Sequence, residues 1–128
     1  MQKILLVIIV GCGGFIGASL RYIISLGATK GFGTQFPYGT LIANILGAVI
    51  IGFVMQLSLD TTLISPNNRL FLTTGMMGGL TTFSTFSYET IGLLNGGQVG
   101  IGIVNIILNL GLSLIGVVVG MALARILV

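Results

Sequence analysis

Residues 75–82 read GMMGGLTT, and they lie in the middle of a long apolar segment that runs over residues 68–94. Three glycines and two threonines fall within this short stretch, and each glycine destabilises a helix interior by about 1 kcal/mol relative to alanine. We therefore predict that a helix formed by this segment is broken here. The alternative interpretation is a continuous helix that packs closely against its neighbours through the glycines.

The chain as a whole is too apolar for a soluble protein. Of its 128 residues, 55% are hydrophobic and only 5% are charged, whereas soluble domains carry about 25% charged residues. Four apolar segments, residues 4–26, 38–59, 68–94 and 99–128, are long enough to cross a bilayer. The sequence therefore predicts an all-α integral membrane protein, a single domain over residues 1–128 with four transmembrane helices and a broken third helix.

The reactive side chains are too few for most enzymes. The chain has no histidine, one cysteine (Cys12) and two carboxylates (Asp60 and Glu89). These residues cannot form a Ser-His-Asp or Cys-His site or a His/Cys metal cluster. The five cationic residues are isolated along the sequence, so they form no basic patch for nucleic acid. We expect neither an enzyme nor a nucleic-acid-binding protein.

Four spans place both termini on the same side of the membrane. Lys3, Arg69 and Arg125 fall on this terminal side, and Arg21 and Lys30 fall on the other. Orientation normally follows an excess of Lys and Arg on one side, and here the excess is a single residue. Either other determinants orient the chain, or it inserts both ways and assembles as an antiparallel, dual-topology homodimer. Two opposite copies would reproduce the inverted-repeat symmetry of many transporters.

The second and fourth predicted spans carry polar side chains at helical spacing. Thr40 and Asn44 are four residues apart, and Asn105, Asn109 and Ser113 repeat every four residues. One interpretation is that they form hydrogen bonds between helices that hold the bundle together. Because polar groups in a membrane are costly and often functional, we favour a hydrated pathway. Amides and hydroxyls donate hydrogen bonds, and no carboxylate accompanies them, so this pathway suits an anion better than a cation.

Two aromatic residues follow the predicted break. Phe83 and Phe86 are three residues apart and share a helix face, with Ser84 and Thr85 between them. By itself, this pattern is typical of lipid-facing or core aromatics. In the functional interpretation, the partly positive ring edges face an anion and the hydroxyls between them donate hydrogen bonds.

Three blocks of this sequence resemble a known family. They are residues 13–22 (GGFIGASLRY), 39–47 (GTLIANILG) and 75–86 (GMMGGLTTFSTF). They are similar to the signature blocks of the Fluc (CrcB) fluoride channels, and the resemblance covers essentially the whole chain. It implies a passive, fluoride-selective channel that exports cytoplasmic fluoride across the inner (plasma) membrane. It also implies an antiparallel, dual-topology homodimer with two pores.

The resemblance further implies roles for single residues. Phe83 and Phe86 would be the pore phenylalanines, and Asn44 the pore asparagine. The backbone carbonyls of Gly78 and Thr81 would hold a structural Na⁺ at the dimer interface. The remaining expected pore residues, which include the other members of the two polar stripes, are Thr40, Ser84, Thr85, Asn105, Asn109 and Ser113. Arg21 is expected in the vestibule. Glu89 fits the family pattern without an assigned role.

Two other classes of membrane protein share this size. Small multidrug exporters are also short, dual-topology proteins with four spans, but they depend on a glutamate in the first span and usually contain tryptophan. This chain has no carboxylate in its first span and no tryptophan. A purely structural assembly subunit would not need the two polar stripes. The fluoride channel is therefore the main interpretation, and the small exporter is the alternative.

Overall fold

Long apolar runs without an internal proline form three long helices. The computed structural model describes residues 1–128. In it, α1 (Gln2–Phe32), α2 (Tyr38–Asp60) and α6 (Val99–Leu127) are each long and apolar enough to cross a membrane. Pro37 directly precedes α2, where its missing N–H interrupts no helical hydrogen bond. The molecule is all-helical, as predicted, and contains no strand.

The third apolar segment is divided among four short helices. In chain order they are α3 (Pro66–Leu70), the π-helix η1 (Phe71–Met77), α4 (Gly78–Leu80) and α5 (Phe83–Asn95). Between α4 and α5 the backbone is extended at Thr81 (φ −82°, ψ 153°) and Thr82 (φ −149°, ψ 120°). The sequence predicted a break within residues 75–82. Helical geometry ends at the last two of these residues, and the three glycines before them remain helical.

The glycines of this segment allow its close contact with α1. A Cβ atom on Gly79 would lie 2.5 Å from the carbonyl oxygen of Gly14, and one on Gly75 would lie 3.0 Å from the Cα of Gly13. Backbones approach each other this closely only where side chains are absent. Close packing, the alternative interpretation of these glycines, therefore describes Gly75 and Gly79, while the backbone leaves the helix after them.

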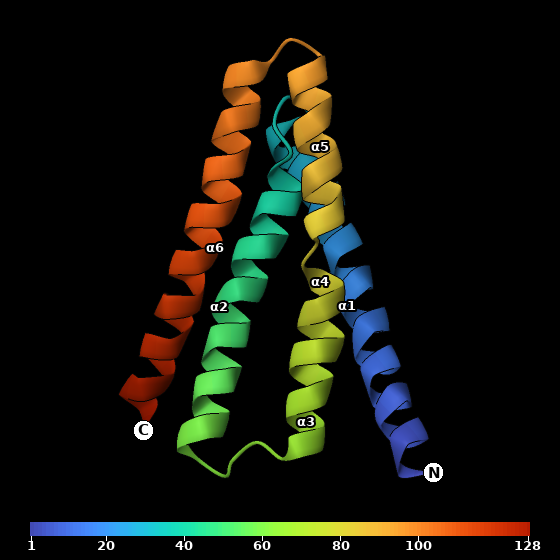
Figure 1. Cartoon of the computed structure of the whole chain (residues 1–128), viewed down its shortest axis with the longest axis vertical. Helices are drawn as coiled ribbons and strands as arrows, with labels where there is room; N and C mark the ends of the chain where they lie inside the picture. The colour runs from blue at the N-terminus through green and yellow to red at the C-terminus, as the bar shows by residue number, and fades with distance from the viewer.

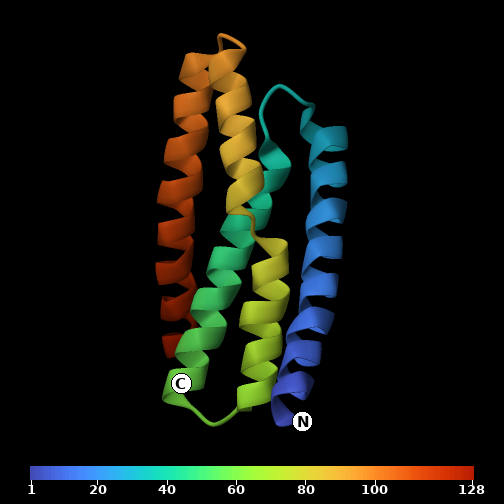
Figure 2. The ribbon, with the colours of Figure 1, turned by 45° about the vertical axis from the view of Figure 1, so that its right-hand side comes forward.

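α2 lies at the centre of the bundle (Figure 1). Its most extensive contact is with α6, and it also packs against α1. α1 packs in turn against η1 and α4, whereas α5 packs mainly against α6. Both termini lie at the same end of the molecule, as Figures 1 and 2 show. An even number of membrane crossings predicts this placement.

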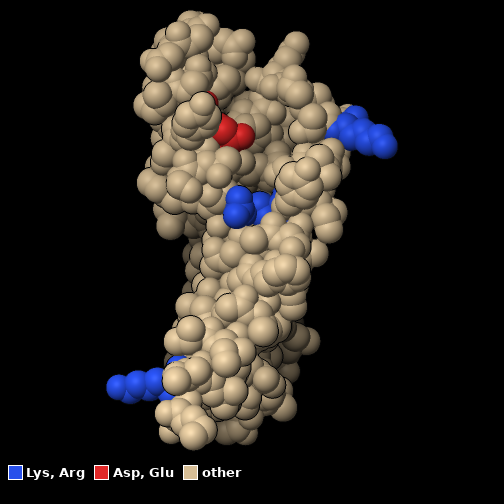
Figure 3. All heavy atoms as spheres, turned by 90° about the vertical axis from the view of Figure 1, so that its right-hand side faces the viewer, with Lys and Arg blue, Asp and Glu red and all other residues tan.

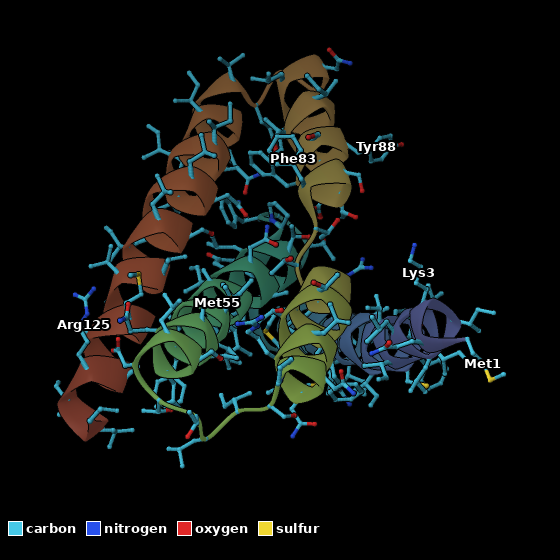
Figure 4. All side chains as sticks on the ribbon, turned by 60° about the horizontal axis from the view of Figure 1, so that its bottom comes forward. Met1, Lys3, Met55, Phe83, Tyr88 and Arg125 are labelled. Carbon is cyan, nitrogen blue, oxygen red and sulfur yellow. The ribbon has the colours of Figure 1, made fainter.

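Few side chains are buried within a single chain. Only 23 of the 128 residues are buried, and the apolar core cluster consists of Ala43, Met77 and Leu80. Many large apolar side chains are exposed along α1 and α6, and they project outward from the ribbon in Figure 4. Soluble monomers rarely expose apolar patches of this extent. The surface therefore suits contact with lipid or with another protein chain.

Candidate functional site

The extended backbone of Thr82 is held by the side-chain amide of Asn44 from α2. Asn44 Oδ1 accepts a hydrogen bond from the Thr82 N–H at 2.8 Å, and Asn44 Nδ2 donates to the Thr82 carbonyl oxygen at 3.2 Å. Backbone groups that leave a helix in an apolar environment need such partners. One side chain therefore replaces both backbone hydrogen bonds that Thr82 would make in a continuous helix.

Side chains also cap the two helix ends at this interruption. Thr82 is the N-cap of α5, and its Oγ1 accepts a hydrogen bond from the Thr85 N–H at 3.2 Å. At the end of α4, Arg21 Nε donates to the Gly79 carbonyl oxygen at 3.0 Å. Such caps satisfy groups that lack a partner within the helix. Arg21, which we expected in a vestibule, thus reaches from α1 to the end of α4.

The same contacts release two backbone carbonyls from the helical pattern. In an α-helix, the carbonyls of Gly78 and Thr81 would accept hydrogen bonds from the N–H groups of Thr82 and Thr85. Those N–H groups instead donate to Asn44 Oδ1 and Thr82 Oγ1. Backbone carbonyl oxygens are ligands for hard cations. The donor chemistry of Gly78 and Thr81 therefore fits the Na⁺ that the resemblance implies.

Phe83 and Phe86 lie side by side at the start of α5. Their ring centroids are 5.6 Å apart, and the ring planes are inclined by 57°. Phe83 is 73% exposed, whereas Phe86 is 7% exposed. Figure 4 shows Phe83 on the side of α5 that faces α6, and Tyr88 on the opposite side. The pair therefore has one ring fixed inside the protein and one ring at its surface.

Both phenylalanines line an open groove of about 750 Å³ between α2, α6 and the divided segment. The polar part of its lining consists of amides and hydroxyls, from Asn44, Thr73, Thr74, Thr81, Thr82, Asn109 and Ser113. No acidic or basic residue lines it. The groove can therefore offer hydrogen-bond donors without fixed charge beside the edges of aromatic rings.

The polar stripe of α6 is largely buried. Asn105 and Asn109 are 1% and 4% exposed, and Asn109 Nδ2 donates to Asn105 Oδ1 at 2.9 Å. Asn109 Oδ1 accepts a hydrogen bond from Asn44 Nδ2 at 2.9 Å. Ser113, one turn further along α6, is half-buried and lines the groove. The structure thus joins amides of the two predicted stripes in one hydrogen-bonded cluster.

A second cavity, of about 390 Å³, lies where α1, α2, α5 and the loop between α1 and α2 meet. Its lining is mostly polar and includes Thr40 and Glu89. Glu89 Oε1 is buried and has no hydrogen-bond partner in the protein. Figure 3 shows acidic atoms in a hollow near one end of the molecule, with basic atoms beside it. The stripe predicted on α2 is therefore divided, with Thr40 at this cavity and Asn44 at the groove.

Comparison with known proteins decides the family. The family model described as CrcB-like protein, camphor resistance (CrcB), matches residues 8–121. The chain belongs to the CrcB family. This match confirms the family that the three sequence blocks predicted.

Several proteins similar to this chain carry the same name. A protein named fluoride-specific ion channel FluC from Clostridium perfringens is 69% identical over 127 residues, which is 99% of both chains. The protein of this name from Clostridium novyi is 64% identical over 126 residues, which is 98% of both chains. The one from Rhizobium meliloti is 42% identical over 122 residues, which is 95% of this chain and 98% of the relative. The relatives are named as channels, so the prediction that the chain is not an enzyme is confirmed. The matches do not support the small-exporter alternative.

Two hydroxyl residues of the CrcB chain lie next to the phenylalanines. Ser84 is exposed, and its Oγ lies 3.4 Å from Thr82 Oγ1. Thr85 is half-buried. Both lie between Phe83 and Phe86 in the sequence, but neither is among the residues that line the groove.

Thr90 is a residue of this cluster that was not predicted from the sequence. This residue is buried on α5, and its Oγ1 accepts a hydrogen bond from Asn105 Nδ2 at 3.0 Å. Thr90 follows Phe86 by four residues, the same spacing that revealed the stripes on α2 and α6. That spacing was the signal that could have identified it.

Proposed function

We propose that the protein is a passive, fluoride-selective channel that exports cytoplasmic fluoride across the plasma membrane. The observation that carries this proposal is the 69% identity, over 99% of both chains, to a protein named fluoride-specific ion channel. The chemistry of the groove supports it, because neutral amides and hydroxyls line the groove and no carboxylate there repels an anion.

In this proposal the ion passes beside Phe83 and Phe86. Fluoride is small and strongly hydrated, so its passage requires hydrogen-bond donors that replace water. Ser113 lines the groove, and Ser84 and Thr85 stand between the two phenylalanines in the sequence; in this proposal their hydroxyls donate hydrogen bonds to the ion. The ring edges add partial positive charge, and narrow apolar walls oppose larger anions such as chloride. Asn44 lines the groove that forms this path. Thr40 lines the second cavity, which in this proposal leads to the groove.

We further infer an antiparallel homodimer that contains two such pathways. The groove is open along one side of a single chain, and nine of its 18 lining residues are hydrophobic, a composition that suits contact with protein. A second copy seated there would enclose the path and remove its apolar wall from lipid. The near balance of cations on the two sides, with an excess of one, permits insertion in both orientations.

A structural Na⁺ at the contact between the two copies completes the proposal. The carbonyls of Gly78 and Thr81 lie outside the helical hydrogen-bond pattern, and both residues line the open groove. Two copies that meet along this groove would bring two sets of carbonyl oxygens together. Oxygen ligands of this kind can replace the hydration shell of a monovalent cation.

Fluoride efflux from liposomes tests the channel proposal. Purified protein is reconstituted into liposomes loaded with potassium fluoride, and a potassium ionophore is added so that the anion can leave without building up charge. We expect rapid fluoride efflux and no comparable efflux from liposomes loaded with chloride. A coupled exporter would require a proton or substrate gradient. Absence of fluoride efflux on addition of the ionophore would therefore overturn the proposal.

A further inference from the structure

A chain of hydrogen bonds through α6 connects the two sides of the proposed pathway. It begins at Asn44 of α2, whose Nδ2 donates to Asn109 Oδ1 at 2.9 Å. Asn109 Nδ2 donates to Asn105 Oδ1 at 2.9 Å, and Asn105 Nδ2 donates to Thr90 Oγ1 at 3.0 Å. Thr90 Oγ1 then donates to the Phe86 carbonyl oxygen at 2.7 Å. The chain therefore ends on the backbone of a residue that lines the groove.

The amides of this chain are occupied with one another. Every donor points in the same direction, from α2 towards α5, and successive hydrogen bonds of one direction strengthen each other. Asn109 has no N–H group left, because its Nδ2 also donates to the Asn105 carbonyl oxygen at 3.0 Å. Asn105 is 1% exposed, so an ion in the groove cannot reach it without rearrangement of the helices. Neither amide is therefore free to replace the water around fluoride.

Apart from the two hydrogen bonds between Asn44 and its N-cap Thr82, α5 has few contacts that fix its position relative to α2. It packs mainly against α6 and only slightly against α2. It also follows two residues with extended backbone, Thr81 and Thr82, so the direction of α4 does not set the direction of α5. The hydrogen-bonded chain is thus a side-chain connection from α2 to the helix that carries the phenylalanines.

We propose that Thr90, Asn105 and Asn109 are positioning residues that hold Phe86 in a fixed place relative to Asn44. This inference rests on the proposed channel function. It gives Asn105 and Asn109 a role different from the pore lining that the sequence predicted, and it adds Thr90. When the chain is broken, the Asn44–Thr82 hydrogen bonds still hold the N-cap of α5 to α2, but the turns of α5 that follow it can shift on α6. The width of the path beside Phe86 then changes, and with it both the rate of fluoride passage and the discrimination against chloride.

Two substitutions of Thr90 separate hydrogen bonding from packing. Thr90→Val keeps the shape of the side chain but removes the hydroxyl, whereas Thr90→Ser keeps the hydroxyl and removes a methyl group. We expect Thr90→Val to lower fluoride efflux per folded protein about three- to tenfold, as for the loss of one hydrogen bond, and to lower the ratio of fluoride to chloride efflux. Thr90→Ser should conduct like the wild type.

Ser58→Ala is the matched control for Thr90→Val. Ser58 Oγ donates to the carbonyl oxygen of the residue four positions earlier at 2.7 Å, as Thr90 Oγ1 does, but Ser58 lies on α2 outside the chain of hydrogen bonds. We expect Ser58→Ala to leave efflux and the ratio of fluoride to chloride efflux unchanged. Equal losses from Ser58→Ala and Thr90→Val would show a general effect of hydroxyl removal and would overturn the proposal.

A double-mutant cycle tests whether Asn105 acts through Thr90. We expect Asn105→Leu and Thr90→Val to lower fluoride efflux by similar factors, and the efflux of the double variant to be no lower than that of either single variant. Asn105→Ala replaces Asn105→Leu if the latter does not fold. Additive losses would overturn the proposal, and so would variants that lose thermal stability while their folded fraction conducts normally. A wild-type protein without fluoride efflux would instead overturn the proposed function, and this inference with it.

Discussion

Asn44 illustrates why an amide, and not another polar group, adjoins the interrupted backbone. The Thr82 N–H needs an acceptor and the Thr82 carbonyl needs a donor, and Asn44 supplies both from one side chain. A carboxylate has no donor, and a hydroxyl would have to serve both groups through one oxygen. A buried polar group left without a partner costs about 1–3 kcal/mol. The choice of asparagine therefore follows from the geometry of the interruption.

At the same scale, Phe83 offers the cleaner test of the aromatic pair, because it is exposed to the groove and its replacement leaves no buried cavity. We expect Phe83→Ile to lower fluoride efflux about tenfold, equivalent to about 1.4 kcal/mol, while the protein remains folded. Tyr88→Ile is the control, since Tyr88 is 84% exposed on the opposite side of the same helix. Efflux is measured from liposomes. Wild-type efflux from Phe83→Ile would exclude this ring from the pathway.

Among the elements, the expected bounds agree better with the helices α2 and α6 than with α1. The expected residues 38–59 and 99–128 agree closely with α2 and α6. The first expected span, residues 4–26, is shorter than α1, which continues to Phe32 and ends at Gly33 with φ of 85°. Apolar residues mark where a chain meets lipid, whereas a helix ends where a residue such as glycine adopts a left-handed conformation. The π-helix η1, which packs against α1, was not predicted from the sequence.

The site could be predicted only in part, because its hydrogen bonds depend on how the helices pack against each other. Helical spacing placed Asn105 and Asn109 on one face of α6. It could not show whether two amides one turn apart face an ion or satisfy each other. The structure shows that they are hydrogen-bonded to each other, and that Thr90 on a different helix accepts from one of them. Such pairings depend on the separation between helices, which one sequence does not specify.

The interruption between α4 and α5 leads to a prediction about sodium. If the Gly78 and Thr81 carbonyls hold Na⁺, the ion stabilises the folded dimer, and this stabilisation grows with the logarithm of the Na⁺ concentration once that exceeds the dissociation constant. We expect replacement of Na⁺ by K⁺ or choline to lower both the melting temperature and the fluoride efflux. Titration of Na⁺ back into the buffer should restore both, with efflux levelling off once the site is filled. An efflux and a melting temperature that do not depend on Na⁺ would remove the ion from the proposal.

The whole molecule is a helical bundle that leaves most of its large apolar side chains exposed. Only 23 residues are buried in one chain, and the groove beside the phenylalanines remains open. Neither the apolar exterior nor the charge distribution distinguishes one direction of insertion strongly from the other. Lipid and a second, inverted copy are the two environments that would cover this surface in our proposal.

Orientation in the membrane tests the antiparallel arrangement. In a Cys12→Ser background, Gln2→Cys introduces a label site at the terminal end, and a membrane-impermeant thiol reagent is applied to intact cells. We expect about half of the copies to react from outside, as equal insertion predicts. Thr62→Lys adds a cation to the loop on the terminal side and should reduce this fraction. If all copies or no copies without the added lysine react with the external reagent, dual topology is contradicted.

The length of α1 has a consequence for the lipids around the protein. Its 31 residues correspond to about 46 Å of helix, whereas the hydrocarbon layer is about 30 Å thick. The last turns of α1, with Lys30, therefore extend into the headgroup layer unless the helix tilts strongly. Thr29, Gly33 and Pro37 of this end line the second cavity. In our proposal, headgroups at this end of α1 would lie beside the cavity, and anionic lipids there would lower the local concentration of fluoride at the proposed entrance.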